Sequence, residues 1–345
     1  AGNHGLWKVE TDLESIIDDS DSGIAAPGDA ISAVTVGAAV GVDHPESMSV
    51  ADQPAPYSRF GPGPLGCVKP NITGLSGTVL PDGTVPIDSY SSVLSPHGLT
   101  TKAGTSFSTP HAAGLLVSMG DIVGDSSNLM ALALTYHYAR VPNWRPRNIR
   151  VDVRNMYGFG IVDDSLLAID PRREAILMRQ SSIRAGDDEI VSIPLPEHIE
   201  GLIGRNHNLR VRVTCLADAV IDRSRGADMV RSTVNFSKKG FKGDNTDNGN
   251  SVFWDVCTRR TYEPTSLEEG GLCITLRGYG KDEMKDKEVR YALVVSLEDL
   301  SGTVDVSAAI RNDGCYPLLG SVDSRLKSRA ESVSSVDTRT LIRGL

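Results

Sequence analysis

The sequence predicts an α/β domain built on a parallel sheet, followed by a β-sandwich-like all-β domain. Two patterns along the chain predict this division. Up to Pro171, strand-like apolar runs alternate with helix-like runs, which is typical of a parallel sheet covered by helices on both faces. Past Pro171, short alternating runs are separated by polar turns, which is typical of antiparallel strands. With 345 residues, the chain is long enough to bury two cores.

Three apolar runs define the elements of the first half. The run from Ile31 to Val42 is rich in Val and Ala and predicts a buried parallel strand. Helices are predicted from Thr109 to Val123 and from Ser127 to Ala139, the second with Ser126 or Ser127 as its N-cap.

The second half carries seven strand-like runs. They extend from Glu189 to Leu195, Leu209 to Leu216, Met229 to Phe236, Ser251 to Thr258, Leu272 to Tyr279, Val289 to Leu297 and Thr303 to Ile310. We therefore predict a first domain of residues 1–171, a boundary between 171 and 187, and a β-rich domain of residues 187–315. Residues 316–345 are rich in Ser and Arg and poor in large apolar side chains, so we expect a loosely held tail.

Two loops of the first half have alternative interpretations. The stretch from Gly74 to Thr101 is rich in Gly, Pro and Ser, and it either shapes access to a cleft or is a surface insertion. The acidic run from Asp18 to Gly23 is interpreted as a solvated loop, with calcium binding as the alternative, since its spacing does not fit an EF-hand.

Charge, hydrophobicity and cysteine content argue against several classes of protein. The chain has 44 acidic and 35 basic residues, a net charge of −9, which argues against a nucleic-acid surface. No apolar run reaches the roughly 18 residues of a membrane span. Zinc is not expected, because none of the 5 cysteines forms a C-x-x-C pair. Cys215, Cys257 and Cys273 lie in strand-like runs and are interpreted as buried free thiols. That favours an intracellular setting, with one disulfide pair as the alternative.

The most informative run extends from Gly104 to Gly114 and reads GTSFSTPHAAG. It places Ser106 at a glycine turn directly ahead of an apolar helix. Free N–H groups and the positive dipole end at a helix N-terminus favour developing negative charge beside such a hydroxyl. Pro110 is tolerated because first-turn residues have no intrahelical N–H partner to lose. These features predict the site of a nucleophile.

This run resembles the G-T-S-x-x-x-P-x-x-x-G signature of the subtilisin-like serine proteases (subtilases, peptidase S8 family), in which the serine is the nucleophile. Three more segments agree in the family's order: AGNHG at 1–5, YSRFGP at 57–62 with KPNI at 69–72, and YGFGIVD at 157–163. Asn71 stands where the family usually has aspartate, and TGLSG follows at 73–77 where A-P-G is usual. The resemblance covers about residues 1–170 and implies the C-terminal part of a subtilisin-like catalytic domain.

The resemblance also implies roles for particular residues. Ser106 would attack the scissile carbonyl of a protein or peptide substrate, and the Ser106 N–H with the Asn3 side-chain amide would hold the oxyanion. The residues expected to bind substrate are Ala1, Gly2, Gly104 and Thr105. No cofactor is required.

In this family the catalytic Asp and His precede the asparagine turn, in the order Asp, His, Ser. Because that asparagine is Asn3, we expect an N-terminally truncated sequence, or alternatively a processed chain, that is inactive alone. His97 is interpreted as a loop residue and His111 as a satisfied core residue, so neither is expected to be the base. The competing hypothesis is a non-catalytic binding protein with the same fold. The joint presence of Ser106 and Asn3 favours the enzyme, and D-[ST]-G and H-G-T-H segments upstream would decide.

Overall fold

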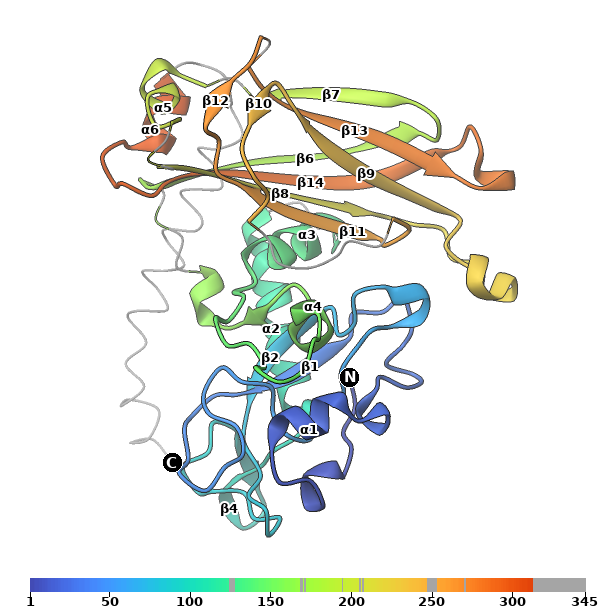
Figure 1. Cartoon of the computed structure of the whole chain (residues 1–345), viewed down its shortest axis with the longest axis vertical. Helices are drawn as coiled ribbons and strands as arrows, with labels where there is room; N and C mark the ends of the chain where they lie inside the picture. The colour runs from blue at the N-terminus through green and yellow to red at the C-terminus, as the bar shows by residue number, and fades with distance from the viewer. Residues whose placement is uncertain are drawn as a thin grey trace.

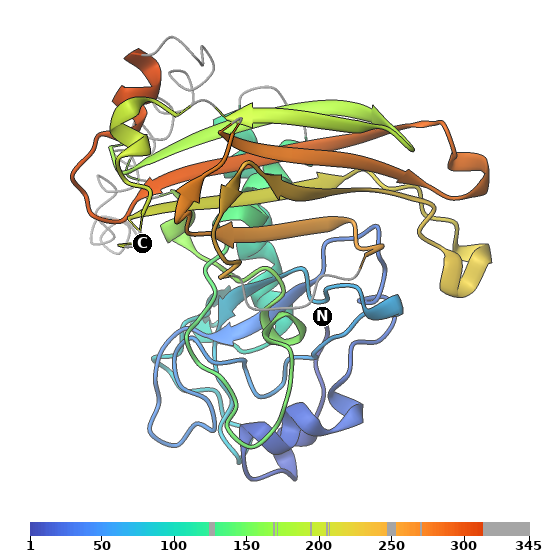
Figure 2. The same ribbon diagram turned by 45° about the horizontal axis from the view of Figure 1, so that its top comes forward.

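The structure is a computed structural model in which two regions meet at a helix (Figure 1). It describes residues 1–123, 128–167, 170, 172–193, 195–204, 206, 208–246, 253–269 and 271–312. Residues up to about 162 form a mixed α/β region around a parallel sheet, and the antiparallel strands form a second region above it. Helix α3 lies between the two regions, as both views show (Figures 1 and 2).

The α/β region is built on a three-stranded parallel sheet in the order β1-β2-β5. The strands are β1 (Val36–Val40), β2 (Ile72–Ser76) and β5 (Ile161–Val162). Every residue of β1 is buried, as its Val- and Ala-rich composition predicts. Helix α2 (Thr105–Val123) packs on β1 and β2, and α3 (Asn128–Tyr138) packs on α2. The predicted cap at Ser126 or Ser127 lies outside the described residues.

Helix α2 approaches the sheet very closely. The Ser108 hydroxyl donates to the carbonyl oxygen of Gly37 on β1 at 3.0 Å. A Cβ at Gly74 on β2 would lie only 2.8 Å from the carbonyl oxygen of Ser108, so a glycine is needed there. The helix begins at Thr105, ahead of the predicted start at Thr109, which brings Ser106 into its first turn.

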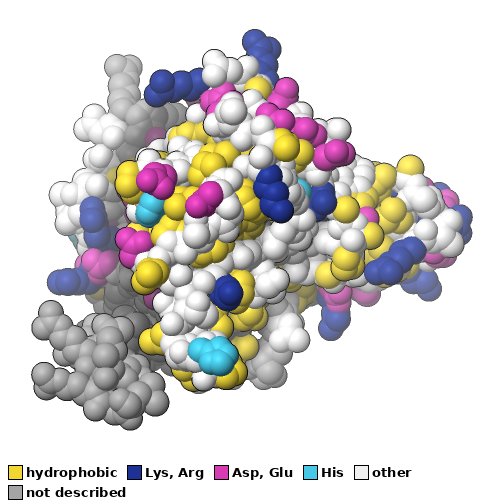
Figure 3. Space-filling model, turned by 90° about the horizontal axis from the view of Figure 1, so that it is seen from below, with side chains coloured by type: hydrophobic (Ala, Val, Ile, Leu, Met, Phe, Trp, Pro, Cys, Tyr) yellow, Lys and Arg dark blue, Asp and Glu magenta, His cyan; other side chains and the backbone are white. Residues whose placement is uncertain are grey.

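Short elements complete this region. They are η1 (Leu6–Lys8), α1 (Leu13–Asp18), η2 (Ser20–Ser22), η3 (Pro64–Gly66), β3 (Ser92–Ser95), β4 (Gly98–Thr101), α4 (Val153–Tyr157) and η4 (Asp164–Leu167). Strands β3 and β4 form an antiparallel hairpin inside the predicted loop of residues 74–101, at the lower end of Figure 1. Exposed apolar side chains occur in and near it, with Ile87 94%, Leu94 73% and Leu99 76% exposed. Seen from this end, hydrophobic side chains are scattered among polar ones (Figure 3).

The second region contains two larger antiparallel sheets, in the orders β11-β8-β14-β6 and β7-β13-β9. Their strands are β6 (Glu174–Arg184), β7 (Asp188–Ile193), β8 (Leu209–Ala217), β9 (Ser232–Lys239), β11 (Cys257–Tyr262), β13 (Leu272–Gly280) and β14 (Glu288–Asp299). The other elements are β10 (Phe241–Lys242), β12 (Ser266–Leu267), α5 (Glu197–Glu200), η5 (Arg223–Asp228), η6 (Asp282–Met284) and α6 (Val306–Asn312).

Three details differ from the predicted strands. The run from Ser251 to Thr258 was predicted as a strand, but the strand there, β11, begins only at Cys257. Strand β6, which pairs along β14, was not predicted. The run from Thr303 to Ile310 was predicted as a strand, and that prediction was wrong, because α6 begins at Val306. The carboxylate of Asp305 accepts from the backbone N–H of Ala308 at 2.8 Å, so a capped helix start prevails over the alternating pattern.

One hydrophobic core runs through both regions. It includes Met119 of α2, Leu134 of α3, Val213 of β8 and Tyr291 of β14, all of them buried. Cys67, Cys215, Cys257 and Cys273 are buried free thiols, as predicted for the last three, and Cys315 lies outside the described residues. Over the described residues, no helix is long and apolar enough to cross a membrane.

Candidate active site

Ser106 lies in the first turn of α2 and is exposed, whereas its neighbour Thr105 is buried. The turn ahead of the helix depends on Gly104, whose φ of +147° is a conformation that side chains disfavour. The backbone N–H of Phe107 closes this turn by donating to the carbonyl oxygen of Gly104 at 3.0 Å. The sequence therefore presents one hydroxyl to solvent at a helix N-terminus.

Asn3 is held directly against this turn. Its side-chain oxygen accepts two hydrogen bonds from Thr105, one from the backbone N–H at 3.1 Å and one from the hydroxyl at 3.0 Å. These bonds fix which end of the amide is the oxygen, so the Nδ2 group faces Gly104, where a Cβ would lie 3.2 Å from it. Within the described part of the chain, no acceptor is hydrogen-bonded to Nδ2. Asn3 thus presents an amide donor beside Gly104, in the turn that leads to Ser106.

The other predicted substrate-binding residues lie beside Asn3. The amine of Ala1 donates to the carbonyl oxygen of Val36 at the start of β1 at 2.6 Å. Gly2 is exposed, has a φ of +92°, and accepts from the backbone N–H of Arg59 at 3.2 Å. The structure therefore brings Ala1, Gly2 and Asn3 together with the Gly104–Ser106 turn on one side of the α/β region.

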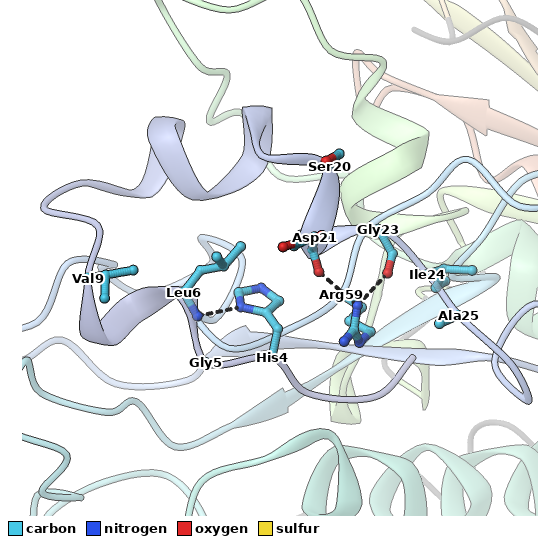
Figure 4. Close-up of a pocket in the computed structure, with 10 residues that line it drawn as sticks. All are labelled: His4, Gly5, Leu6, Val9, Ser20, Asp21, Gly23, Ile24, Ala25 and Arg59. Carbon is cyan, nitrogen blue, oxygen red and sulfur yellow. Dashed lines mark hydrogen bonds between the residues drawn. The ribbon is translucent and has the colours of Figure 1, made fainter.

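A cavity of about 520 Å³ adjoins Asn3 through the next residue, His4. Figure 4 shows its lining, which consists of His4, Gly5, Leu6, Val9, Ser20, Asp21, Gly23, Ile24, Ala25 and Arg59. The Arg59 guanidinium closes one side by donating to the carbonyl oxygens of Asp21 at 2.8 Å and Gly23 at 2.7 Å. Sequence reasoning missed this cavity. The sequence signal nearest to it was that Asn3 and Arg59 both lie in segments that resemble subtilase motifs.

His4 lies close to Asn3, but both of its ring nitrogens have partners. Nε2 lies 3.0 Å from the carbonyl oxygen of Ser58, and Nδ1 accepts from the backbone N–H of Leu6 at 3.3 Å. These contacts define a neutral ring with its proton on Nε2. Burial lowers the pKa of His4, which agrees with the neutral form. His4 is therefore not oriented to take a proton from Ser106.

The two histidines considered from the sequence also lie away from Ser106. His97 is exposed in the turn between β3 and β4, as expected for a loop residue. His111 was interpreted as a satisfied core residue, and this was wrong. Its side chain is 31% exposed with Nε2 3.8 Å from Asp164, and its buried Nδ1 has no hydrogen-bond partner among the described residues. Over those residues, no hydrogen bond joins Ser106 Oγ to a histidine or a carboxylate.

A buried ammonium group organises the segment that leads to β2. Lys69 donates to the carbonyl oxygens of Ala30 and Ala33, both at 2.7 Å, to the Thr35 hydroxyl at 3.1 Å and to the Asn71 side-chain oxygen at 2.8 Å. Burial lowers the pKa of Lys69 to about 8. Asn71, at a position where the subtilase pattern usually has aspartate, thus supplies one of the uncharged oxygens that surround the Lys69 ammonium group. Elsewhere in the described chain, no group of three or more His, Cys, Asp or Glu side chains could hold a metal.

Comparison with known proteins agrees with the geometry. Residues 1–160 match the model of the subtilase family (peptidase S8). The uncharacterized protein y4bN of Sinorhizobium fredii is 26% identical over 262 aligned residues, which cover 65% of this chain and 59% of the relative. The chain thus spans well under two thirds of that relative's length. The covered share exceeds residues 1–160, so the similarity continues into the antiparallel region. The first part of the chain is therefore subtilase-like.

Proposed function

We propose that the protein is a serine endopeptidase that cleaves peptide bonds through an acyl-enzyme on Ser106, with Asn3 in the oxyanion hole. One observation carries this proposal. Thr105 holds the side-chain oxygen of Asn3 with two hydrogen bonds, which leaves the amide N–H₂ facing Gly104, in the turn that leads to the exposed Ser106. A pre-oriented donor next to a hydroxyl at a helix N-terminus is what stabilises the oxyanion in acyl transfer.

The residues around Ser106 would have separate roles in this reaction. Ser106 Oγ would attack the carbonyl carbon, and the oxyanion would accept from the Ser106 N–H and from Asn3 Nδ2. The exposed backbone of Gly2, with Ala1, Gly104 and Thr105, would border the bound peptide. The reaction needs no cofactor.

The reaction also needs a base, which the described surroundings of Ser106 do not supply. Loss of the histidine alone costs subtilisin about 2 × 10⁶ in kcat. We therefore propose that the catalytic His and Asp are supplied from outside residues 1–345, and that these residues alone hydrolyse no peptide detectably.

The test compares residues 1–345 alone with the same residues expressed together with any coding sequence upstream of them. Both are treated with a fluorophosphonate probe and with casein. We expect labelling at Ser106 and casein digestion only in the longer form, both abolished by Ser106→Ala. Turnover by residues 1–345 that Ser106→Ala abolishes would show that a base lies within them. A longer form that folds but does not label would refute the proposed enzyme.

Two variants of Asn3 separate its proposed catalytic part from its structural part. Asn3→Asp keeps the acceptor for Thr105 and removes the donor, whereas Asn3→Ala removes both. In the active form, both should lower kcat by about 10²–10³, the cost of losing this kind of donor in subtilisin. Only Asn3→Ala should also lower the melting temperature. An unchanged kcat in Asn3→Asp would refute the oxyanion role.

A second candidate is a non-catalytic binding protein with this fold. It is favoured by the lack of a base hydrogen-bonded to Ser106 among the described residues. This candidate predicts peptide binding that Ser106→Ala leaves unchanged and no fluorophosphonate labelling in any form.

For residues 187–315 we propose a β-sandwich-like domain that packs on the catalytic part. The proposal is supported by the two antiparallel sheets and the core that they share with α3.

A further inference from the structure

A second cavity, of about 540 Å³, lies where the two regions meet, far along the chain from Ser106. Its lining comes from the segment after α3, from β8 and from β11 with its flanks. The residues are Tyr138, Ala139, Arg140, Val141, Asn143, Arg145, Arg210, Arg212, Thr246, Arg259, Thr261 and Glu263. Five of these side chains are guanidinium groups and one is a carboxylate. That is a concentration of positive charge in a chain whose net charge is −9.

Two of the arginines are neutralised by carboxylates. Arg140 pairs with Asp52 at 2.6 Å and with Asp163 at 3.1 Å. Arg210 pairs with Glu298 at 3.1 Å and lies 3.8 Å from Glu263.

Arg145 and Arg212 differ, because no carboxylate oxygen of the described chain lies within 4.0 Å of either guanidinium. Arg145 donates to the carbonyl oxygens of Pro142 at 2.5 Å and Trp144 at 2.7 Å, and Arg212 donates to that of His137 at 3.2 Å. Each guanidinium has five N–H donors, so donors remain for a ligand. Although Arg212 also interacts electrostatically with Glu174, neither guanidinium forms an ion pair with a carboxylate of the described chain, so the cavity retains positive charge that can attract an anion.

The geometry also favours one class of ligand. Guanidinium groups bind oxyanions through paired N–H donors. Here they approach from three separate segments of the chain. A phosphate group has oxygens pointing in several directions and can accept from all of them, whereas the oxygens of one carboxylate lie in a single plane. The volume is that of a small-molecule site rather than of a single ion.

We propose that this cavity, defined by Arg145 and Arg212, binds a small anion bearing more than one phosphate group. Such a ligand would bridge the α/β region and the antiparallel region, because Arg145 belongs to the first and Arg212 to the second. It would therefore stabilise the contact between the two regions. The proposal is independent of the chemistry at Ser106.

Calorimetric titration of residues 1–345 with pyrophosphate at constant ionic strength tests the proposal. We expect one site per chain with a Kd below about 1 mM, and a melting temperature that rises with pyrophosphate. Citrate at the same concentration should bind at least about tenfold more weakly. Equal binding of citrate, or an effect that sodium chloride reproduces, would overturn the phosphate assignment.

Variants locate the site. Arg145→Gln lies in a loop and should fold normally while weakening pyrophosphate binding about tenfold or more. Arg212→Gln should weaken pyrophosphate binding to a similar extent, and Arg212→Lys should bind pyrophosphate more tightly than Arg212→Gln does. The matched control is Arg290→Gln, whose 72% exposed side chain pairs with Asp218 outside the cavity and which should bind normally. Wild-type affinity in the folded Arg145→Gln variant would overturn the proposal.

Discussion

Two polar sites in this molecule differ in how completely their groups are bonded. At the junction of α3 with the antiparallel sheet, His137 is fully buried, with Nδ1 3.0 Å from the Thr214 hydroxyl and Nε2 2.9 Å from the Ser296 hydroxyl. At the start of α2, Ser106 and Asn3 are exposed, and Asn3 uses only its oxygen. A side chain whose polar atoms are all bonded internally serves the fold. One that is fixed at one end keeps a polar group at its other end that can still bond to a ligand or to solvent.

At the junction, buried side chains of the sheet hydrogen-bond to α3 and to the segment just after it. Besides His137, Arg259 donates to the carbonyl oxygen of Tyr136 in the last turn of α3 at 2.7 Å and to that of Ala139 just after the helix at 3.1 Å. Positive groups at a helix C-terminus interact favourably with the negative end of the helix dipole, and they donate to carbonyl groups that lack helical partners. The sheet thus holds the end of α3 with side chains from β8, β11 and β14.

We expect the greatest change in the free energy of unfolding from a substitution in the apolar part of the junction. Leu134 on α3 is fully buried in the core shared by the two regions. Leu134→Ala should lower the free energy of unfolding by about 2–5 kcal/mol. Both regions should lose their structure in one urea transition, followed by circular dichroism and by tryptophan fluorescence. The control Leu99→Ala, at a position 76% exposed, should change stability by about 0.5 kcal/mol or less. Two separate transitions would contradict a shared core.

The second effect is the pH dependence that His137 imposes. Burial holds the pKa of His137 well below its usual value of 6.5, and the nearby Arg212 and Arg259 act in the same direction. Below pH 6.5 the unfolded chain therefore binds a proton that the folded chain does not. The contribution is complete above pH 6.5 and is lost as the pH falls, by up to about 1.4 kcal/mol per pH unit.

Urea unfolding at several pH values below 6.5 measures this slope. His137→Gln should flatten it, while His97→Gln, at an exposed turn position, should leave it unchanged. Burial raises the pKa of the neighbouring Glu174, which contributes in the opposite direction but equally in all three proteins. An identical slope in His137→Gln and the wild type would show that another group dominates.

Sequence patterns indicated the turn at Ser106 but not this junction, for physical reasons. The turn at Gly104–Ser106 is encoded by adjacent residues, so a local pattern was enough to find it, and the resemblance to the subtilases linked it to Asn3. His137 had no recognisable partner pattern, because Thr214 and Ser296 reach it only through long-range strand pairing. Strand β6 was missed for a similar reason, since its pairing with β14 decides the conformation of residues 174–184.

A third, smaller effect tests how Asn3 is held. Thr105→Val keeps the shape of the side chain and removes the hydroxyl that donates to Asn3 at 3.0 Å. We expect a loss of about 0.5–1.5 kcal/mol in the free energy of unfolding. Thr109→Val is the matched control, because the Thr109 hydroxyl donates within the same helix, to the Thr105 carbonyl oxygen at 2.7 Å. Removing such a bond should cost less. Equal losses in the two variants would mean that the hydroxyl does not help to hold Asn3.

The smallest expected effect concerns the outer face of α2, where Val117 is 67% exposed and Ala113 and Gly114 are exposed as well. Valine and serine have similar helix propensities, so Val117→Ser should change the free energy of unfolding by about 0.5 kcal/mol or less. Helix α2 thus has one face bonded to the sheet through Ser108, and its opposite face lies in solvent. A loss of 2 kcal/mol or more would show that the outer face is covered in solution. Sedimentation of the wild type over a range of concentrations would then separate coverage by a second copy from coverage within one chain.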